Sequence, residues 1–283
     1  MGRHFESNMA QDYLTALLKS YWFAPPVALW RAIELRVVSQ QRFSRPLLDL
    51  GCGDGLIGQA LFGSGCNTDV GLDPWFDQLR RAASLQVYGC VSQAAGSAMP
   101  FPDERFSTVF SNSVLEHIPD IVPVLQEVAR VLTPSGRFVF TVPSDAFRTM
   151  LDGYAQRVAI DDVAGAEAYA SVVDERLDHH QYHGPQGWTK LLAGAGMSLL
   201  QATYYIPQEV ERHWDRMNTR FGIGQRGSPW SLLVSPRLAF LGFQRTLRRL
   251  VVRRLSHRWR QYYEMDVRPG DKGGALLITA QRD

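Results

Sequence analysis

Residues 47–55 read LLDLGCGDG, and this stretch decides the fold. A short apolar run ends here in a cluster of three glycines, which predicts a buried strand that enters a tight turn. The next residues, LIGQALF, have the spacing of the start of a helix. A strand, a glycine turn and a helix in this order hold a nucleotide at the N-terminus of the helix. The stretch therefore raises the question of which nucleotide the chain binds.

Predicted strands and helices alternate on both sides of this turn. Helical segments over 9–40 are interrupted by Pro25 and Pro26. Strands are predicted at 46–50, 68–73, 86–93, 106–113 and 133–143, and helices from about 55, at 75–85 and at 121–132, the last with Asp120 as its N-cap. Two further strands are predicted at 197–206 and 273–282. Such alternation predicts a mostly parallel sheet with helices on both faces.

Composition and cysteine usage exclude several classes of protein. The chain has 283 residues, of which 45% are hydrophobic and 20% charged, as in ordinary globular proteins. Its three cysteines are widely spaced, which argues against a zinc site or a disulfide scaffold and favours a reducing compartment. No signal peptide and no apolar run of roughly 20 residues is present, so we expect a cytoplasmic protein. A net charge of +2 does not predict nucleic-acid binding.

Charge decides between two nucleotides for the turn. Residues 53–58, GDGLIG, match the dinucleotide pattern G-x-G-x-x-G, which is a weak signal alone. Asp49 and Asp54 would repel a pyrophosphate but suit a ligand with a positive centre and an ammonium group. S-adenosylmethionine has both and carries no phosphate. The chain also lacks the Tyr-x-x-x-Lys pattern expected of a dehydrogenase.

Four motifs in order give the chain a family resemblance. They are DLGCGDG at 49–55, GLD at 71–73, MPFPDERFSTVFSNSVLEHI at 99–118 and EVARVLTPSGRFVFTVP at 127–143. With them the chain resembles the class I S-adenosylmethionine-dependent methyltransferases that act on small molecules, closely over 45–145 and loosely over 180–206. The resemblance implies a Rossmann-like α/β fold with a mostly parallel seven-stranded sheet. It also implies transfer of a methyl group to a small-molecule or lipid-linked acceptor, with S-adenosylhomocysteine as product.

The resemblance also implies a set of cofactor-binding residues. The methionine end would face Asp49, Gly51, Cys52 and Gly53, and the ribose hydroxyls would bind Asp73. Pro74 or Trp75 would flank the adenine, whose edge would be surrounded by Gly96, Ser97 and Met99. Near the sulfonium we expect Ser111 and Asn112. The family usually has an acid where Ala95 stands, so here the adenine amino group must be held by backbone or water.

Histidines are the candidate catalytic residues, because an oxygen or a protonated nitrogen acceptor can need a general base near pH 7. His117 follows the fourth strand, although it could merely shape the loop. In DHHQYHGPQGW, His179, His180 and His183 lie close together, and we select His180 and His183 as candidates. The spacing H-H-x-x-H resembles a metal pattern, but no cysteine or acidic cluster accompanies it, so we expect no metal.

Around the core we expect three added parts: an N-terminal helical cap at 1–45, a second cap over the acceptor site at 145–185, and a final segment, 186–283, that completes the sheet. The core itself spans 46–144, and an arginine-rich insertion at 207–272 separates the last two strands. Within the insertion an apolar helical face is predicted, with arginines 245, 249 and 253 turned away from it; the face comprises Phe240, Phe243, Leu247, Leu250, Val251 and Leu255.

Three interpretations of this arginine-rich helix remain open. It could pack on the core with a solvated arginine face, lie through 237–263 on the anionic inner surface of a membrane, or form an anion pocket. For the whole chain the alternative to an enzyme is a non-catalytic regulator or scaffold that binds S-adenosylmethionine or S-adenosylhomocysteine and uses this helix for a partner. A cap that fills the acceptor pocket with its own side chains would favour that alternative.

Overall fold

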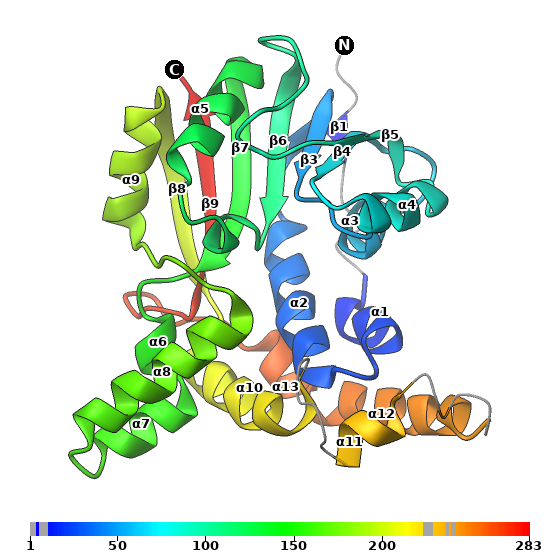
Figure 1. The fold of residues 1–283 in the computed structure, drawn as a ribbon, viewed down its shortest axis with the longest axis vertical. Coiled ribbons are helices and arrows are strands. Elements are labelled where there is room, and N and C mark those ends of the chain that lie inside the picture. The colour runs from blue at the N-terminus through cyan, green and yellow to red at the C-terminus, as the bar shows by residue number, and fades with distance from the viewer. Residues whose placement is uncertain (1–3, 6–10, 223–228, 236–237, 239–241) are drawn as a thin grey trace.

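A computed structural model describes the whole chain except residues 1–3, 6–10, 223–228, 236–237 and 239–241. Its centre is a seven-stranded sheet (Figure 1). The strands are β3 (Leu47–Leu50), β4 (Thr68–Asp73), β5 (Tyr88–Gln93), β6 (Phe106–Asn112), β7 (Leu132–Pro143), β8 (Met197–Tyr205) and β9 (Ala275–Arg282). A separate antiparallel pair joins β1 (His4–Phe5) to β2 (Phe43–Ser44).

The strand order is β5–β4–β3–β6–β7–β9–β8. Neighbours from β5 to β7 are parallel, whereas β9 runs antiparallel to both β7 and β8. The predicted mostly parallel sheet of seven strands is therefore confirmed. Although 69 residues separate Tyr205 from Ala275, these two residues are paired in the β8–β9 ladder, so the insertion leaves the final hairpin of the sheet intact.

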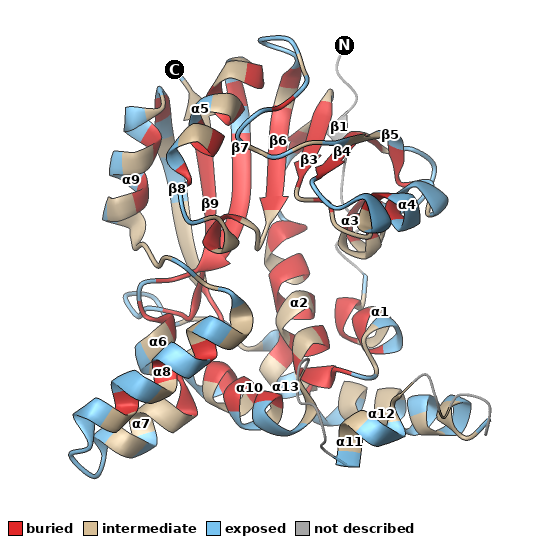
Figure 2. Ribbon diagram, viewed as in Figure 1, coloured by how far each residue is buried: buried red, intermediate tan, exposed pale blue. Residues whose placement is uncertain are grey.

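Helices cover both faces of the sheet. They are α1 (Tyr13–Ser20), α2 (Pro25–Val38), α3 (Leu56–Phe62), α4 (Phe76–Ser84), α5 (Val122–Val131) and α9 (Pro185–Gly194). Successive residues of a strand point to opposite faces of the sheet, so β7 contributes to two separate hydrophobic cores. Phe138 and Phe140 pack in the core with α5 and α9, whereas Val139 packs in the core with α1 and α2. The central strands and most of α2 are accordingly buried (Figure 2).

The starts of two helices show how local sequence sets the elements. Pro25 and Pro26 occupy the first turn of α2, where a missing N–H is tolerated, so the predicted break is the start of a helix. Asp120 accepts a hydrogen bond from the backbone N–H of Val122 at 3.2 Å. The capping position of α5 is nevertheless Ile121, one residue later than predicted.

Below the sheet lies a second group of helices (Figure 1). It contains α6 (Phe147–Met150), α7 (Asp152–Val158), α8 (Val163–Leu177), α10 (Gln208–Phe221), α11 (Pro229–Leu233), α12 (Gln244–Arg258) and α13 (Arg260–Glu264), together with the short 3₁₀ turn η1 (Leu115–His117) that follows β6. Asp215 of α10 ties α7 and α8 together, because it accepts hydrogen bonds from the Gly153 N–H and the Tyr169 hydroxyl.

The predicted apolar face of the arginine-rich helix is only partly formed. Phe243, Leu247, Val251 and Leu255 are half-buried, but 59% of Leu250 is exposed, and Phe240 lies outside the described residues. No residue of α12 is fully buried. Among the described helices, none combines the length and the hydropathy needed to span a membrane.

Candidate functional site

The glycine turn after β3 lines a cavity of about 440 Å³ at the carboxyl ends of β3, β4 and β6. Gly51 and Gly53 adopt φ angles of +77° and +54°, which favour glycine. A side chain at Gly51 would also meet Val114 at 2.5 Å. These two glycines let the backbone turn tightly and leave the space above it open. The cavity lies where the chain order of the sheet reverses, which is the usual ligand site of such folds.

Asp73 is held at the end of β4 by the turn itself. Its two carboxylate oxygens accept hydrogen bonds from the backbone N–H groups of Gly53 and Trp75, both at 2.9 Å. The residue is buried, yet it lines the cavity. A fixed carboxylate with free lone pairs at this position can bind a pair of ribose hydroxyls.

Asp49 lies deeper, at the floor of the same cavity. Tyr88 donates a hydrogen bond to its carboxylate at 2.6 Å. Burial, with a smaller contribution from the charge of Asp73, raises the pKa of Asp49 to about 7. A positively charged ligand group nearby would stabilise the ionised form of this carboxyl.

The structure brings six of the predicted cofactor residues together in the cavity lining: Asp49, Gly51, Cys52, Gly53, Asp73 and Asn112. The other five, Pro74, Gly96, Ser97, Met99 and Ser111, do not line it. Met99 is buried in the core, and its N–H donates to Glu127 at 2.7 Å. Ser111 is also buried, and its hydroxyl donates to the carbonyl of Leu50, so it joins β6 to β3.

Beside the cavity lies an ion pair with a buried carboxylate and a half-buried guanidinium, which the sequence-based predictions do not include. Glu34 of α2 pairs with Arg31 at 2.7 Å. Its carboxylate also accepts hydrogen bonds from Asn112, Ser113 and the Tyr205 hydroxyl. Burial alone would raise the pKa of Glu34, but the ion pair and the hydrogen bonds outweigh burial and lower it. The signal in the sequence is a pair of opposite charges three residues apart within the apolar stretch ALWRAIEL.

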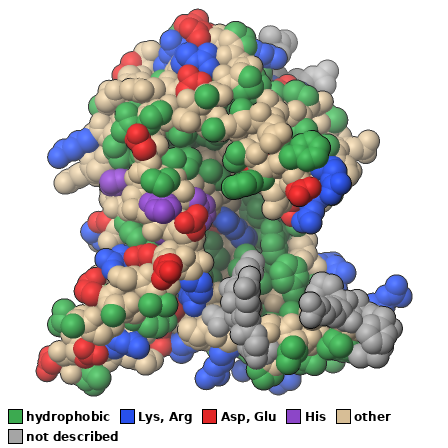
Figure 3. Space-filling view, viewed as in Figure 1, with side chains coloured by type: hydrophobic (Ala, Val, Ile, Leu, Met, Phe, Trp, Pro, Cys, Tyr) green, Lys and Arg blue, Asp and Glu red, His purple; other side chains and the backbone are tan. Residues whose placement is uncertain are grey.

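A second cavity, of about 140 Å³, adjoins the first. Both cavities are lined by Arg31, Ser113 and His117. The remaining walls come from α2, α10 and the helices after β7, and they are mostly apolar, including Trp30, Phe147 and Trp214. The side chains of the cap leave this space open, as an acceptor pocket requires. On this face of the molecule the histidines gather beside a hollow between the sheet and the lower helices (Figure 3).

Hydrogen bonds assign the protons on the two histidines of the second cavity. His117 Nδ1 lies 2.9 Å from the carbonyl of Asp178, which can only accept. His179 Nδ1 lies 3.0 Å from the Tyr182 hydroxyl, whose own proton is donated to Asp174 at 2.5 Å. Both Nδ1 atoms are therefore donors, and each Nε2 atom carries a lone pair. The Nε2 of His117 lies 3.9 Å from Oε1 of Glu116, too far for a hydrogen bond. Burial lowers the pKa of both histidines, to about 3 for His179, so both are neutral at neutral pH.

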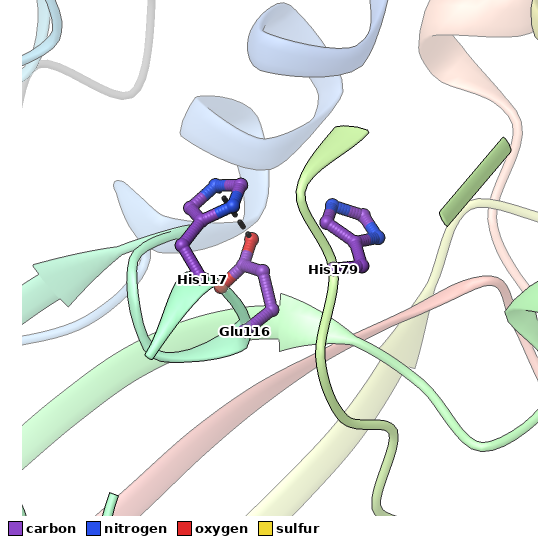
Figure 4. A group of neighbouring side chains, drawn as sticks. All are labelled: Glu116, His117 and His179. Carbon is purple, nitrogen blue, oxygen red and sulfur yellow. Dashed lines mark ion pairs between the residues drawn. The ribbon is translucent and has the colours of Figure 1, made fainter. Parts of the chain in front are cut away.

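Glu116 completes this group (Figure 4). It is buried, and its Oε2 atom has no hydrogen-bond partner among the residues that the structure describes. Burial raises the pKa of Glu116 to about 8. Glu116, His117 and His179 each bring one atom that can bind a metal within 4.8 Å of the others, a composition that suits a divalent cation. Of the three histidines in the H-H-x-x-H spacing, this group contains His179 and neither His180 nor His183.

The other two candidate histidines lie elsewhere. His180 is exposed, and its Nε2 lies 3.2 Å from Asp178. His183 Nε2 donates a hydrogen bond to Oε1 of Gln181 at 3.0 Å, and its ring meets the edge of Trp188. Neither lines either cavity. His179 lines the second cavity from an irregular loop, and the sequence carries no periodicity that selects it over its neighbours.

Comparisons with known proteins agree with this geometry. Residues 48–140 match the model of a family described as a methyltransferase domain. An uncharacterized methyltransferase of Schizosaccharomyces pombe is 39% identical over 102 residues, which cover 34% of this chain and 39% of the relative. A ubiquinone biosynthesis O-methyltransferase of Coxiella burnetii is 26% identical over 214 residues, or 72% of this chain and 86% of that protein.

Among solved structures, a methyltransferase of Thermotoga maritima, described as a possible histamine N-methyltransferase, shares the fold with a TM-score of 0.55. It is 11% identical, and the match covers 94% of this chain and 99% of that one. The fold and the glycine turn are those of the class I S-adenosylmethionine-dependent methyltransferases, and the family match makes residues 48–140 a methyltransferase domain. In this enzyme the matched methyltransferase domain extends over β3 to β7.

Proposed function

We propose that this enzyme methylates a hydroxyl or amino group of a small molecule bound in the 140 Å³ cavity. The observation that carries the proposal is the shared wall of the two cavities. Because Arg31, Ser113 and His117 line both, a ligand in one cavity lies next to a ligand in the other. The Coxiella relative, whose name specifies an O-methyltransferase, supports an oxygen acceptor.

The cofactor would lie with its methionine end over Asp49 and the glycine turn, and with its ribose on Asp73. The turn's open backbone and the two carboxylates support this orientation. We keep Pro74, Gly96, Ser97 and Met99 as the proposed adenine side, and Ser111 as a residue near the sulfonium. The segment 145–185 remains the proposed acceptor cap, because Phe147, Leu177 and His179 line the second cavity.

His117 and His179 would position the acceptor. Each offers a neutral Nε2 lone pair, which accepts a hydrogen bond from an acceptor O–H or N–H. Methyl transfer is an in-line displacement at the sulfonium carbon, so holding the acceptor lone pair in line supplies much of the rate. Two hydrogen-bond acceptors at this place favour an oxygen or nitrogen nucleophile over carbon.

The test uses S-adenosylmethionine with a labelled methyl group and a panel of small hydroxyl and amino compounds. We expect His179→Ala to lower kcat by about 10- to 100-fold with any accepted compound, the scale of lost alignment. His183→Ala, a change in the same loop outside the cavity, is the matched control and should leave kcat unchanged. Equal rates for both variants would contradict the positioning role, and a larger loss in His183→Ala would restore the prediction made from the sequence.

The same assay run with EDTA separates positioning from metal chemistry. We expect an unchanged rate, since the proposal needs only the two lone pairs. A rate that EDTA abolishes and Zn²⁺ or Mn²⁺ restores would instead assign Glu116, His117 and His179 to a metal centre.

We further propose that the enzyme works in the cytoplasm and touches an anionic membrane surface through the described part of 237–263, near a lipid-linked acceptor. The arginines of α12 and the lack of acidic residues between 237 and 263 support this contact. Flotation with phosphatidylglycerol vesicles should show binding at low salt that is lost near 0.5 M salt, because screening shortens the reach of exposed charges. Failure to float at low salt would end this part of the proposal.

A further inference from the structure

A large cavity lies away from the cofactor site, among α10, α11 and α12. Its volume is about 670 Å³, within the range of sites that hold drug-sized ligands. Its walls are mainly apolar and include Met217 and Phe221 of α10, Trp230 of α11, and Leu250, Val251 and Leu255 of α12. A partly open apolar space of this size is suited to a hydrocarbon chain whose head group remains near solvent.

Two arginines give this cavity a charged edge. Arg254 and Arg258 line it, and no acidic residue does so among the described lining. Burial, and then nearby arginines, lower the pKa of His213 to about 4, so this third basic residue of the lining is neutral. The cavity therefore combines an apolar interior with two positive charges.

The arginines of α12 also lack internal partners. Six of them lie on this helix, at positions 245, 248, 249, 253, 254 and 258, and within the described part of the chain none forms an ion pair. Arg260, directly after the helix, shows the contrast: it pairs with Asp12 at 2.7 Å. Positive charges beside an apolar cavity, with no carboxylate to neutralise them, are complementary to an anion that carries an apolar group.

We propose that this cavity binds a single-chain amphiphile with an anionic phosphate or carboxylate head. The chain occupies the apolar interior, and the head pairs with Arg254 and Arg258, whose planar guanidinium groups bind such oxygens in pairs. A free anion would leave the interior unused, and a neutral chain would leave the arginines unpaired. This site is independent of the methyl-transfer proposal, since it shares no lining residue with either of the other two cavities.

The test uses dodecyl phosphate below its critical micelle concentration. Trp230 and Trp259 line the cavity, so filling it should shift the tryptophan emission of the full chain in a saturable way. The double variant Arg254→Gln/Arg258→Gln should bind about tenfold more weakly or worse. The matched control, Arg245→Gln/Arg249→Gln, removes the same charge from the same helix outside the cavity and should bind like the wild type.

Additional variants and ligands identify the class of molecule that the cavity binds. Met217→Trp should block binding by filling the cavity while it leaves every arginine in place, and titration with S-adenosylmethionine shows whether each variant is folded. Dodecyl maltoside and inorganic phosphate should both bind far more weakly than dodecyl phosphate.

Three results would overturn the proposal: binding of dodecyl phosphate that does not saturate, binding of dodecyl maltoside with the same affinity, or an equal loss of binding in both double variants. Binding to phosphatidylglycerol vesicles without binding of the monomer would also overturn it, since this means adsorption to a surface.

Discussion

At the scale of single residues, the proposed contact between Asp49 and the cofactor would make cofactor binding depend on pH. Its raised pKa of about 7 means that part of the population is protonated at neutral pH. The ammonium group of the cofactor favours the carboxylate, so binding should lower this pKa and release a proton to the buffer. Affinity for S-adenosylmethionine should accordingly fall as the pH drops below 7.

Calorimetry at pH 7 in buffers of different ionisation enthalpy measures this release. We expect the observed binding enthalpy to depend on the buffer for the wild type and to lose that dependence in Asp49→Asn. A wild-type enthalpy that is the same in all buffers would show that Asp49 does not change its protonation on binding.

The ion pair of Arg31 and Glu34 is an example of a feature that the sequence does not predict. Both lie on α2, whose apolar pattern predicts a helix correctly but says nothing of what it meets. Glu34 matters because it accepts hydrogen bonds from β6, through Asn112, and from β8, through Tyr205. Those partners lie 78 and 171 residues away in the chain, and only the folded sheet brings them to one carboxylate.

At the scale of elements, the turn between β3 and α3 is the part that sequence specifies most tightly. We expect Gly51→Ala to destabilise the protein by about 1–3 kcal/mol, because the new Cβ meets Val114 and the φ of +77° disfavours alanine. Gly194→Ala is the control, since a Cβ there meets nothing within 4 Å. It should be neutral or stabilise by up to about 1 kcal/mol.

Urea unfolding of both variants makes the comparison. Equal free energies of unfolding for the two variants would contradict the steric account of the turn. This turn can be predicted from the sequence for a physical reason. The strand, the glycines and the carboxylates that form it all lie within the nine residues 47–55, so its geometry depends on local sequence alone.

The insertion between β8 and β9 is the opposite case. Its arginines predict an exposed basic helix, and α12 is one, but the predicted apolar face is incomplete because Leu250 is exposed. The periodicity of a helix reveals which residues share a face. It does not reveal how much of that face another element covers, and here α10 and α11 leave a cavity instead of a packed contact.

At the scale of the whole molecule, the motifs predict the sheet and the position of the cofactor cavity. Both depend on the positions of individual strands, and each of these strands is predicted from its own local sequence. The position of the proposed acceptor cavity does not follow from the motifs. Its walls come from α2, the turn after β6, the segment after α8 and α10, which are distant in the chain. For this reason the sequence predicts His180 and His183 as catalytic candidates, although only their neighbour His179 lines the cavity.

The central claim is that the glycine turn and Asp73 bind S-adenosylmethionine. Calorimetric titration with S-adenosylmethionine and with S-adenosylhomocysteine tests it most directly, in the wild type, in Asp73→Ala, and in Asp77→Ala as an exposed control on α4. We predict micromolar binding of both ligands, weakened by about 1–3 kcal/mol in Asp73→Ala through the loss of hydrogen bonds to a polar ligand, and unchanged in Asp77→Ala. No binding by the wild type, or equal affinity in Asp73→Ala, would contradict the account.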